Sequence, residues 1–199
     1  GGGGGSGGGG GTTSPPPPTP PTPTVPPVVT TPTAVRVSQA SPFVNGCLTV
    51  SAAATIYRNA EVEPHLAIDR LSPNHLVAAW QQDRLSDGGA LGLVTAVSVD
   101  GGTSWSGHRG APFSQCAGGR FERVSDPWVS VAGSTVIQAG IAFTGAALTS
   151  GARSSVLVSR SLDGGFNWTP SVAVADDDGS QYFHDKESVT IDPTDPRYV

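Results

Sequence analysis

Short runs of alternating apolar and polar residues, separated by turn residues, make up most of the chain after residue 60. Alternation with a period of two is typical of β-strands that bury one face, and Gly, Pro, Asn and Asp between the runs mark turns. The predicted strands are Leu66–Ile68, His75–Gln81, Leu91–Val99 and Ala111–Phe113 in one stretch, and Trp128–Val131, Thr135–Phe143, Ser155–Ser161 and Ser171–Ala175 in the next. No segment of useful length has a helical period. The sequence therefore predicts an all-β fold.

Two motifs recur in this pattern with the same spacing. Ser98–Trp105 and Ser161–Trp168 both read S-x-D-G-G-x-x-W. A second element begins at Glu63 and recurs at Asp126, and this step equals the step from the first box to the second. A third copy of the element follows at Lys186, after a slightly shorter step. Four antiparallel strands in a period of about 60 residues describe one blade of a β-propeller. We predict a partial propeller with blades near 60–121 and 122–183 and a third blade that begins at 184.

The S-x-D-G-G-x-x-W box has a structural explanation. Its Asp can accept hydrogen bonds from nearby backbone N–H groups, as in an Asx-turn. Its Gly pair permits positive φ, and its Trp can pack the indole back between strands. We therefore interpret the box as a staple that joins two strands, and not as a catalytic site. The staple positions are Ser98, Asp100, Gly102, Trp105, Ser161, Asp163, Gly165 and Trp168.

The N-terminal stretch 1–33 differs in composition from the rest of the chain. Residues 1–11 are Gly apart from Ser6, and residues 12–33 are almost wholly Thr, Pro and Val. Neither stretch can bury enough apolar surface to offset the entropy of ordering it. We predict a disordered linker over 1–33, flexible in its Gly-rich part and stiffer in its Pro-rich part, followed by the partial propeller over 34–199.

Charge and composition exclude some classes of function. The net charge is −5 with acids and bases scattered, so no basic stripe indicates nucleic-acid binding. No apolar run approaches the roughly 20 residues that span a bilayer, so no transmembrane segment is predicted. Thr/Pro linkers are commonest on exported proteins, which predicts a secreted or cell-surface location. The chain contains no Met and ends at residues 197–199, just after the turn-like residues 192–196, so we expect a fragment at both ends.

Cys47 and Cys116 are the only cysteines. In an exported chain they either form one disulfide or are two unrelated small hydrophobic residues. No Cys-x-x-Cys pair or His cluster predicts a zinc site. The acidic run Asp176–Asp178 offers oxygen ligands but lacks the spacing of an EF-hand loop. We predict no metal site and no cofactor.

The two S-x-D-G-G-x-x-W boxes resemble the Asp-boxes, or bacterial neuraminidase repeats, of the sialidase superfamily. The resemblance covers about residues 57–199. It implies a six-bladed propeller, of which this chain would hold about a third. It also implies that a glycan or glycoconjugate is the partner and that the intact protein is a glycosidase of the exo-α-sialidase type. Oligomeric state is not predicted.

The resemblance also implies site residues. Leu76–Arg84 is similar to the family stretch L-L-A-F-x-E-x-R, in which the arginine contacts the sugar, so Arg84 is a candidate substrate-binding residue. Asp87 follows where the family keeps its acid/base, and it is the candidate catalytic residue. The family's first arginine lies in an R-I-P motif, but here Val62 stands at that position. Arg58 lies four residues before Val62. It is the remaining candidate for the first substrate-binding arginine.

Three functions therefore stay open. One is a glycoside hydrolase, which Arg84 and Asp87 favour. Another is a non-catalytic propeller that binds glycans or proteins at the cell surface, which Val62 favours because it cannot clamp a carboxylate as a guanidinium does. The last is an architectural propeller. Glu63, Asp126 and Asp185 open successive inner strands and form either a ring that binds a polar ligand or a set of ordinary turn residues.

Overall fold

The computed structural model describes residues 2–5, 33–49, 54–107 and 109–199. The chain divides into two units, 1–33 and 34–199. In the first unit the described residues are exposed and belong to no helix or strand. The predicted linker over 1–33 falls mostly on residues outside the described part, so its disorder stays a prediction.

The described part of the second unit is built from strands, all paired antiparallel. The elements are β1 (Ile56–Ile68), β2 (Leu76–Leu85), β3 (Ala90–Ser98), β4 (Ser106–Gly107), the 3₁₀ helix η1 (Gln115–Ala117), β5 (Arg123–Ala132), β6 (Thr135–Thr144), β7 (Arg153–Ser161) and β8 (Val172–Asp178). The prediction of an all-β fold is confirmed.

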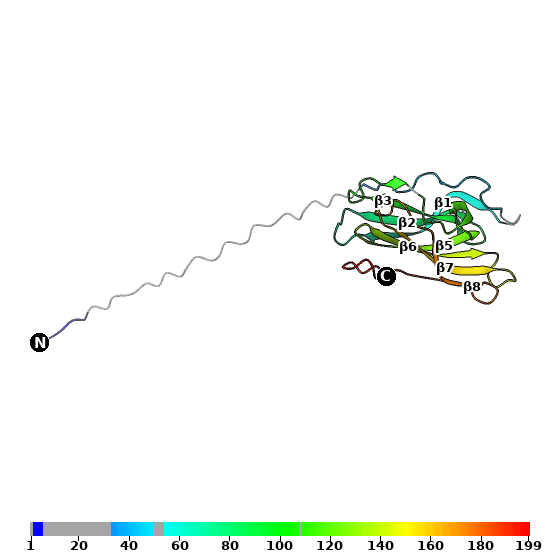
Figure 1. The fold of residues 1–199 in the computed structure, drawn as a ribbon. Coiled ribbons are helices and arrows are strands. Elements are labelled where there is room, and N and C mark those ends of the chain that lie inside the picture. Colours follow the sequence, from blue (N-terminus) through cyan, green and yellow to red (C-terminus); the bar gives the residue numbers. More distant parts are fainter. Residues whose placement is uncertain (1, 6–32, 50–53, 108) are drawn as a thin grey trace. The chain divides into compact units, whose positions relative to one another are not determined.

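The strands form two four-stranded groups. Pairing runs β1-β2-β3-β4 in the first group and β5-β6-β7-β8 in the second. Within the described strands, the groups are joined by a single pair, Ala90 of β3 with Val124 of β5. Each group is therefore one blade of the partial propeller that the repeat predicts, and they are called blade 1 and blade 2 below (Figure 1).

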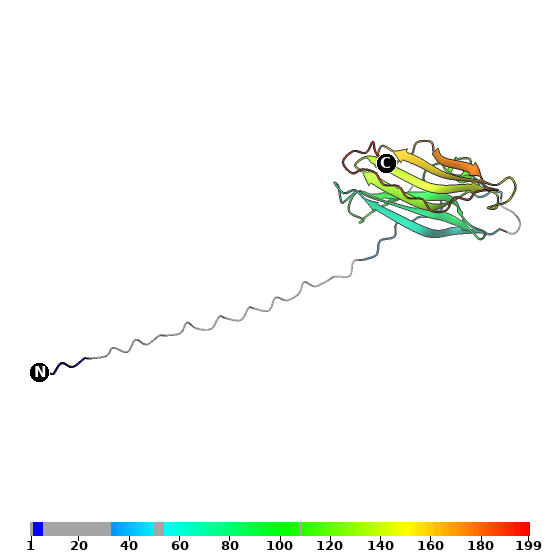
Figure 2. The ribbon, with the colours of Figure 1, turned by 90° about the horizontal axis from the view of Figure 1, so that it is seen from below.

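The two blades pack face to face. Alternate residues of a strand point to opposite faces, so Val77 and Ala79 of β2 project toward blade 2. There they form a buried cluster with Val129 and Val131 of β5. Figure 2 shows the two sheets as stacked layers. Burial of these apolar side chains from water is the main force that holds blade to blade.

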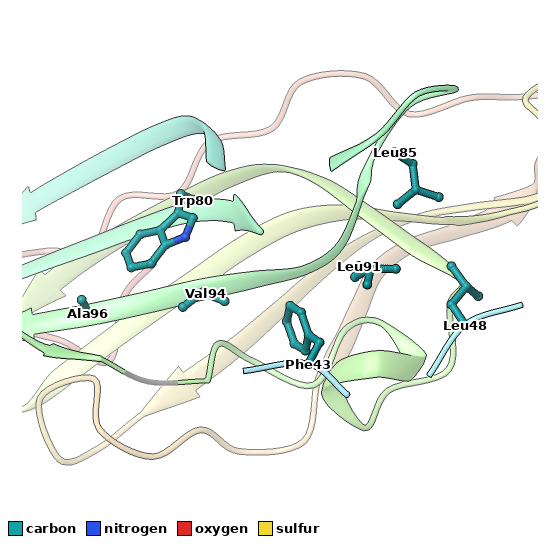
Figure 3. Packing of buried hydrophobic residues seen from close by; sticks show 7 residues of the cluster. All are labelled: Phe43, Leu48, Trp80, Leu85, Leu91, Val94 and Ala96. Atoms are coloured by element: carbon teal, nitrogen blue, oxygen red, sulfur yellow. The ribbon is translucent and has the colours of Figure 1, made fainter. Parts of the chain in front are cut away.

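The opposite face of blade 1 is covered by the segment that precedes it. Phe43 and Leu48 pack on Trp80, Leu91 and Val94 of β2 and β3 (Figure 3). The segment is also tied covalently to η1, because Cys47 and Cys116 form a disulfide. Both faces of the β2–β3 pair are therefore buried, which explains why every residue of β3 is buried.

The third copy of the repeat lies against blade 2. It contains no strand, but Val189 and Ile191 are buried against Ile137 and Ala139. The Ile191 N–H donates to the Ser130 hydroxyl at 3.0 Å. The corresponding residues of the second copy, 129 and 131, pack on blade 1 in the same way. The third copy therefore docks as the start of an inner strand.

One strand prediction is wrong. The fourth strand of blade 1 is the short β4 at Ser106–Gly107, and the predicted strand Ala111–Phe113 is a connection. Ala111 and Phe113 are buried between the blades, in the cluster around Leu93, which explains why they are apolar. The N–H of Ala111 donates to Oε1 of the Gln138 side chain at 2.9 Å, and not to a neighbouring strand.

Candidate functional site

A cavity of about 320 Å³ lies where the β2–β3 turn of blade 1 meets the start of β5 and the end of β6. Arg84 and Asp87, the two residues singled out in the sequence, both line it. Arg123, Asp126 and Asp185 line it as well. The fold therefore brings two arginines and three carboxylates from three repeats to one cavity.

Arg84 is held by one end of its guanidinium. Its Nη1 donates to the carbonyl of Gly89 at 2.8 Å and to Oε1 of Gln81 at 3.4 Å. In the described part of the chain, Nε and Nη2 have no hydrogen-bond partner. A guanidinium carries five N–H donors, so three of them remain for a ligand.

Gln81 links Arg84 to the inner strands. It is fully buried on β2, and its Nε2 donates to the carboxylate of Glu63 on β1 and to the Ser125 hydroxyl on β5 at 3.1 Å. Because both ends of the amide are engaged, the side chain has one orientation. Gln81 therefore sets where the Arg84 guanidinium lies.

Asp87 sits on the rim of the cavity, with half of its side chain exposed. Its Oδ1 lies 3.1 Å from Nη1 of Arg123, a buried residue of β5. The ion pair crosses from blade 1 to blade 2. A ligand in the cavity would meet both charges.

Glu63 and Asp126 interact across the start of the inner strands. Burial raises the pKa of Glu63, and a hydrogen bond with Asp126 raises it further. Burial also pushes the pKa of Asp126 upward, but hydrogen bonds from Ser125 and Lys186 outweigh it, so that pKa is lowered. Of the two carboxyls, Asp126 is the one that carries the negative charge more readily.

Glu187 lies in a neighbouring hollow of about 250 Å³, which Glu63 and Asp126 also line. Burial and the nearby charge of Asp126 raise its pKa to about 7. Both carboxylate oxygens are buried and have no hydrogen-bond partner in the described part. Of the predicted ring, Glu63 and Asp126 line this hollow, whereas Asp185 lines the larger cavity with Asp126. Lys186, which also lines the hollow, pairs with Asp126.

Arg58, the other candidate substrate-binding residue, lies outside this cavity. Its Nη1 forms an ion pair of 2.5 Å with the buried carboxylate of Asp83, and its Nη2 donates to the carbonyl of Phe43 at 2.7 Å. These contacts tie β1 to β2 and to the preceding segment. A residue committed in this way supports the fold and is not placed to contact a ligand near Arg84.

In the first S-x-D-G-G-x-x-W box, the hydroxyl of Ser98 donates to Asp100 at 2.8 Å and accepts from Gly102 N–H at 2.8 Å. Asp100 also accepts from the N–H and hydroxyl of Ser104, and these bonds lower its pKa to about 2. The Trp105 indole donates to the carbonyl of Gly102 at 3.1 Å. All of these partners belong to the box itself.

The second box repeats the Ser and Asp hydrogen bonds of the first, but the buried indole nitrogen of Trp168 has no hydrogen-bond partner in the described part. Ser161 donates to Asp163 at 2.7 Å and accepts from Gly165 N–H at 2.9 Å. Hydrogen bonds from Asn167, through side chain and backbone, lower the pKa of Asp163 to about 2. Trp168 packs among buried residues of both blades.

The first box lies far from the cavity. The cavity is lined by Gly89, which immediately precedes β3, and the first box begins at Ser98, the last residue of β3. At about 3.3 Å per residue, the two ends of this strand are about 25 Å apart. A change in the first box therefore has no direct contact with a ligand in the cavity.

The described histidines lie in different places. His65 stacks on Trp128 with ring centroids 4.1 Å apart, His75 contacts the carbonyl of Gly164 at 2.9 Å, and His184 pairs with Asp177 at 2.8 Å. His108 is outside the described residues. In the described part, no group of three or more His, Cys, Asp or Glu side chains is arranged to hold a metal ion.

Arg123 and Gln81 are absent from the sequence-based candidates. A signal for Arg123 exists in the repeat, because the corresponding residue of the first repeat is Ala60. A charged residue on a buried strand, where the first repeat has a small apolar one, indicates a specific ion pair. No comparable signal marks Gln81, whose partners come from two other strands.

No protein-family model and no curated protein matches this chain. Some solved structures do. A Trypanosoma rangeli sialidase in complex with the inhibitor DANA is 16% identical, with a TM-score of 0.40 over 58% of this chain and 21% of that one. A mutant of that sialidase displaying trans-sialidase activity is 17% identical, with a TM-score of 0.41 over 69% of this chain and 24% of that one. The chain spans about a fifth to a quarter of their length.

None of the helices in the described part is both long and apolar enough to cross a membrane.

Proposed function

We propose that residues 34–199 are part of a sialidase-like β-propeller of an exported protein, and that the cavity beside Arg84 and Asp87 binds the carboxylate of an acidic sugar. The resemblance of the two boxes to Asp-boxes supports the family part of this proposal. The disulfide between Cys47 and Cys116 supports export, since disulfides persist in oxidising compartments.

The observation that carries the proposal is the hydrogen bonding of the Arg84 guanidinium. Its Nη1 is held by Gly89 and Gln81, and the other three donors have no partner in the described residues. A planar guanidinium that is fixed at one end and has donors to spare suits the bidentate recognition of a carboxylate. The cavity around it would take the rest of a sugar.

The remaining walls of the cavity fit a sugar ring. Asp126 offers acceptor oxygens for hydroxyl groups, and the rings of Phe143 and Phe183, 5.6 Å apart between centroids, offer apolar surface to C–H faces. Pockets that combine apolar surface with a few fixed polar groups are typical of small-ligand sites. The cavity volume of about 320 Å³ is at the small end of that class.

A glycoside hydrolase of the exo-α-sialidase type is the second candidate. The observation that favours it is the presence of Asp87 on the rim of the same cavity as Arg84. A general acid/base must reach the scissile oxygen. Because Oδ1 of Asp87 is engaged by Arg123, Oδ2 is the atom that would exchange a proton.

Calorimetric titration of the full-length protein with N-acetylneuraminic acid and with its methyl ester tests the proposed binding. The ester has the same ring without the charge, so we expect it to bind at least tenfold more weakly. Arg84→Gln should weaken binding of the acid by about 10- to 100-fold, since hydrogen bonds to charged groups contribute roughly 1.5–3 kcal/mol.

The matched control is Arg70→Gln. Arg70 is an exposed arginine in the turn after β1, outside the cavity, so its loss should leave affinity unchanged. Equal binding of acid and ester, or no effect of Arg84→Gln, would overturn the proposal.

A further inference from the structure

One guanidinium, that of Arg123, contacts both rims of the cavity. Its Nη1 donates to the carbonyl of Gly88 at 3.1 Å and lies 3.1 Å from Oδ1 of Asp87, in the β2–β3 turn. Its Nη2 donates to the carbonyl of Gly145, after β6, at 2.9 Å. The side chain is only 9% exposed. A single buried group therefore joins a turn of blade 1 to a loop of blade 2.

The surroundings of Arg123 leave it little freedom. Its guanidinium carbon lies over the Phe143 ring, 4.9 Å from the ring centroid. The neighbouring turn residue Gly89 has φ of +69°, and a Cβ there would lie 2.6 Å from Cζ of Phe143 and 3.2 Å from the Cβ of Arg123. The turn, the ring and the arginine are therefore packed in contact.

The contacts of Arg123 need the shape of arginine. The two bonded rims are reached by different nitrogens of one rigid plane, while the central carbon of that plane lies over an aromatic ring. A lysine ammonium is a single point with three donors, and it cannot reach two separated carbonyls and stack on a ring at once. The arrangement therefore depends on arginine, and not on a positive charge alone.

We propose that Arg123 is the positioning residue of this cavity: its guanidinium fixes the Asp87–Gly89 turn and the Gly145 loop in the relative position that a ligand at Arg84 requires. The link from Arg123 to Arg84 is the turn itself, because the carbonyl that holds Arg84 Nη1 belongs to Gly89. The statement that a ligand at Arg84 requires this position rests on the proposed function. The statement that Arg123 holds the two rims together does not.

Amide hydrogen exchange on the full chain tests the clamp without any ligand. In Arg123→Lys we expect the amides of Gly88 and Gly145, which donate to Leu85 and Glu122, to exchange at least tenfold faster than in the wild type. Arg120→Lys is the matched control. Arg120 also stacks on a ring, that of Phe121, and pairs with Asp176, but it is exposed and outside the cavity. It should leave both amides unchanged.

The wild-type protein provides a second measurement if Arg123→Lys fails to fold. A guanidinium held at both Nη atoms rotates slowly, so Arg123 should give separate Nη1 and Nη2 signals in NMR spectra, whereas exposed Arg120 should give one averaged signal. An averaged signal from Arg123, or unchanged exchange at Gly88 and Gly145 in the variant, would overturn the inference.

Titration with N-acetylneuraminic acid separates the clamp from the proposed function. If the wild type binds the sugar, Arg123→Lys should weaken binding about tenfold or more although it keeps the positive charge. If the Gly88 and Gly145 amides exchange faster in the variant and the wild type binds no acidic sugar, the clamp is confirmed and the proposed function is wrong. If the wild type binds and Arg123→Lys binds equally well, the positioning role is wrong.

Discussion

The Nζ of Lys186 lies 3.1 Å from Oδ2 of Asp126, although the two side chains occupy the same position in successive repeats. Glu63 holds this position in the first repeat. All three residues have left-handed backbone, with φ of 53° at Glu63, 52° at Asp126 and 72° at Lys186. The repeat thus keeps its backbone conformation where the side chain changes from acid to base. Because neighbouring inner strands start side by side, the base of the third repeat pairs with the acid of the second.

Docking of the third repeat should depend on pH through Glu187. Burial raises its pKa to about 7, from an ordinary value of 4.5. The docked state therefore holds the proton more tightly than the unfolded state, and this contribution to stability is full below about pH 4.5 and lost as the pH rises through 7. We expect the melting temperature of the wild type to fall from pH 5 to pH 8, and that of Glu187→Gln to fall less.

The control for Glu187→Gln is Thr190→Ala, which changes an exposed, uncharged residue in the same segment. It should follow the wild-type curve of melting temperature against pH. Parallel curves for Glu187→Gln and the wild type would show that this carboxyl does not control docking.

The two boxes should stabilise the fold in their ionised state. Internal hydrogen bonds lower the pKa of Asp100 and Asp163 to about 2, below the ordinary 3.8. Their contribution is therefore present above about pH 4 and is lost as the pH falls through 2. We expect Asp100→Asn and Asp163→Asn to lower the melting temperature at pH 7 and to approach the wild type near pH 2. Thermal scans at several pH values measure this.

Ligand binding provides the second readout on the boxes. Because the first box lies about 25 Å from the cavity along β3, the affinity of folded Asp100→Asn for an acidic sugar should equal that of the wild type. Unchanged stability together with lost binding would instead make the boxes functional sites, against the staple interpretation.

A hydrolase would depend on Asp87. The full-length protein should be assayed with a panel of aryl glycosides that includes a sialoside. If Asp87 is the acid/base, Asp87→Ala should lower kcat by 100-fold or more, because positioned proton transfer contributes roughly 10²–10⁴-fold. Full activity in Asp87→Ala would make Asp87 a turn residue and a partner of Arg123 only. No hydrolysis by the wild type would leave the binding function.

The strand pattern and the two boxes could be read from the sequence because alternation and turn chemistry depend on residues close together in the chain, and the repeat because it needs only the comparison of one stretch with the next. Alternation marks β2, β3, β6 and β7, and identical boxes mark the same turn twice. The failure at Ala111–Phe113 has the same origin. Three apolar residues in a row look alike whether they bury themselves in a strand or in a connection between blades, and only the packing around Phe113 distinguishes the two.

Only some residues of the candidate site could be predicted from the sequence. Arg84 and Asp87 belong to one short stretch of chain, so a local motif could suggest both. Arg58 was suggested on the same local grounds, but in the structure it forms an ion pair with Asp83 outside the cavity. Arg123 contributes from β5, a strand of the next repeat, and a motif confined to one turn could not include it.

The sequence by itself determined the all-β class, the existence of the repeat and the chemistry of the two boxes, because period, glycine and turn chemistry are local properties of a chain. Only the tertiary structure decided which charges meet. The stacking of blade 2 on blade 1 brings Arg123 to Asp87, and the docking of the third repeat brings Lys186 to Asp126. Such pairs follow from the packing of apolar faces distant in sequence, and the order of residues along one strand does not contain that information.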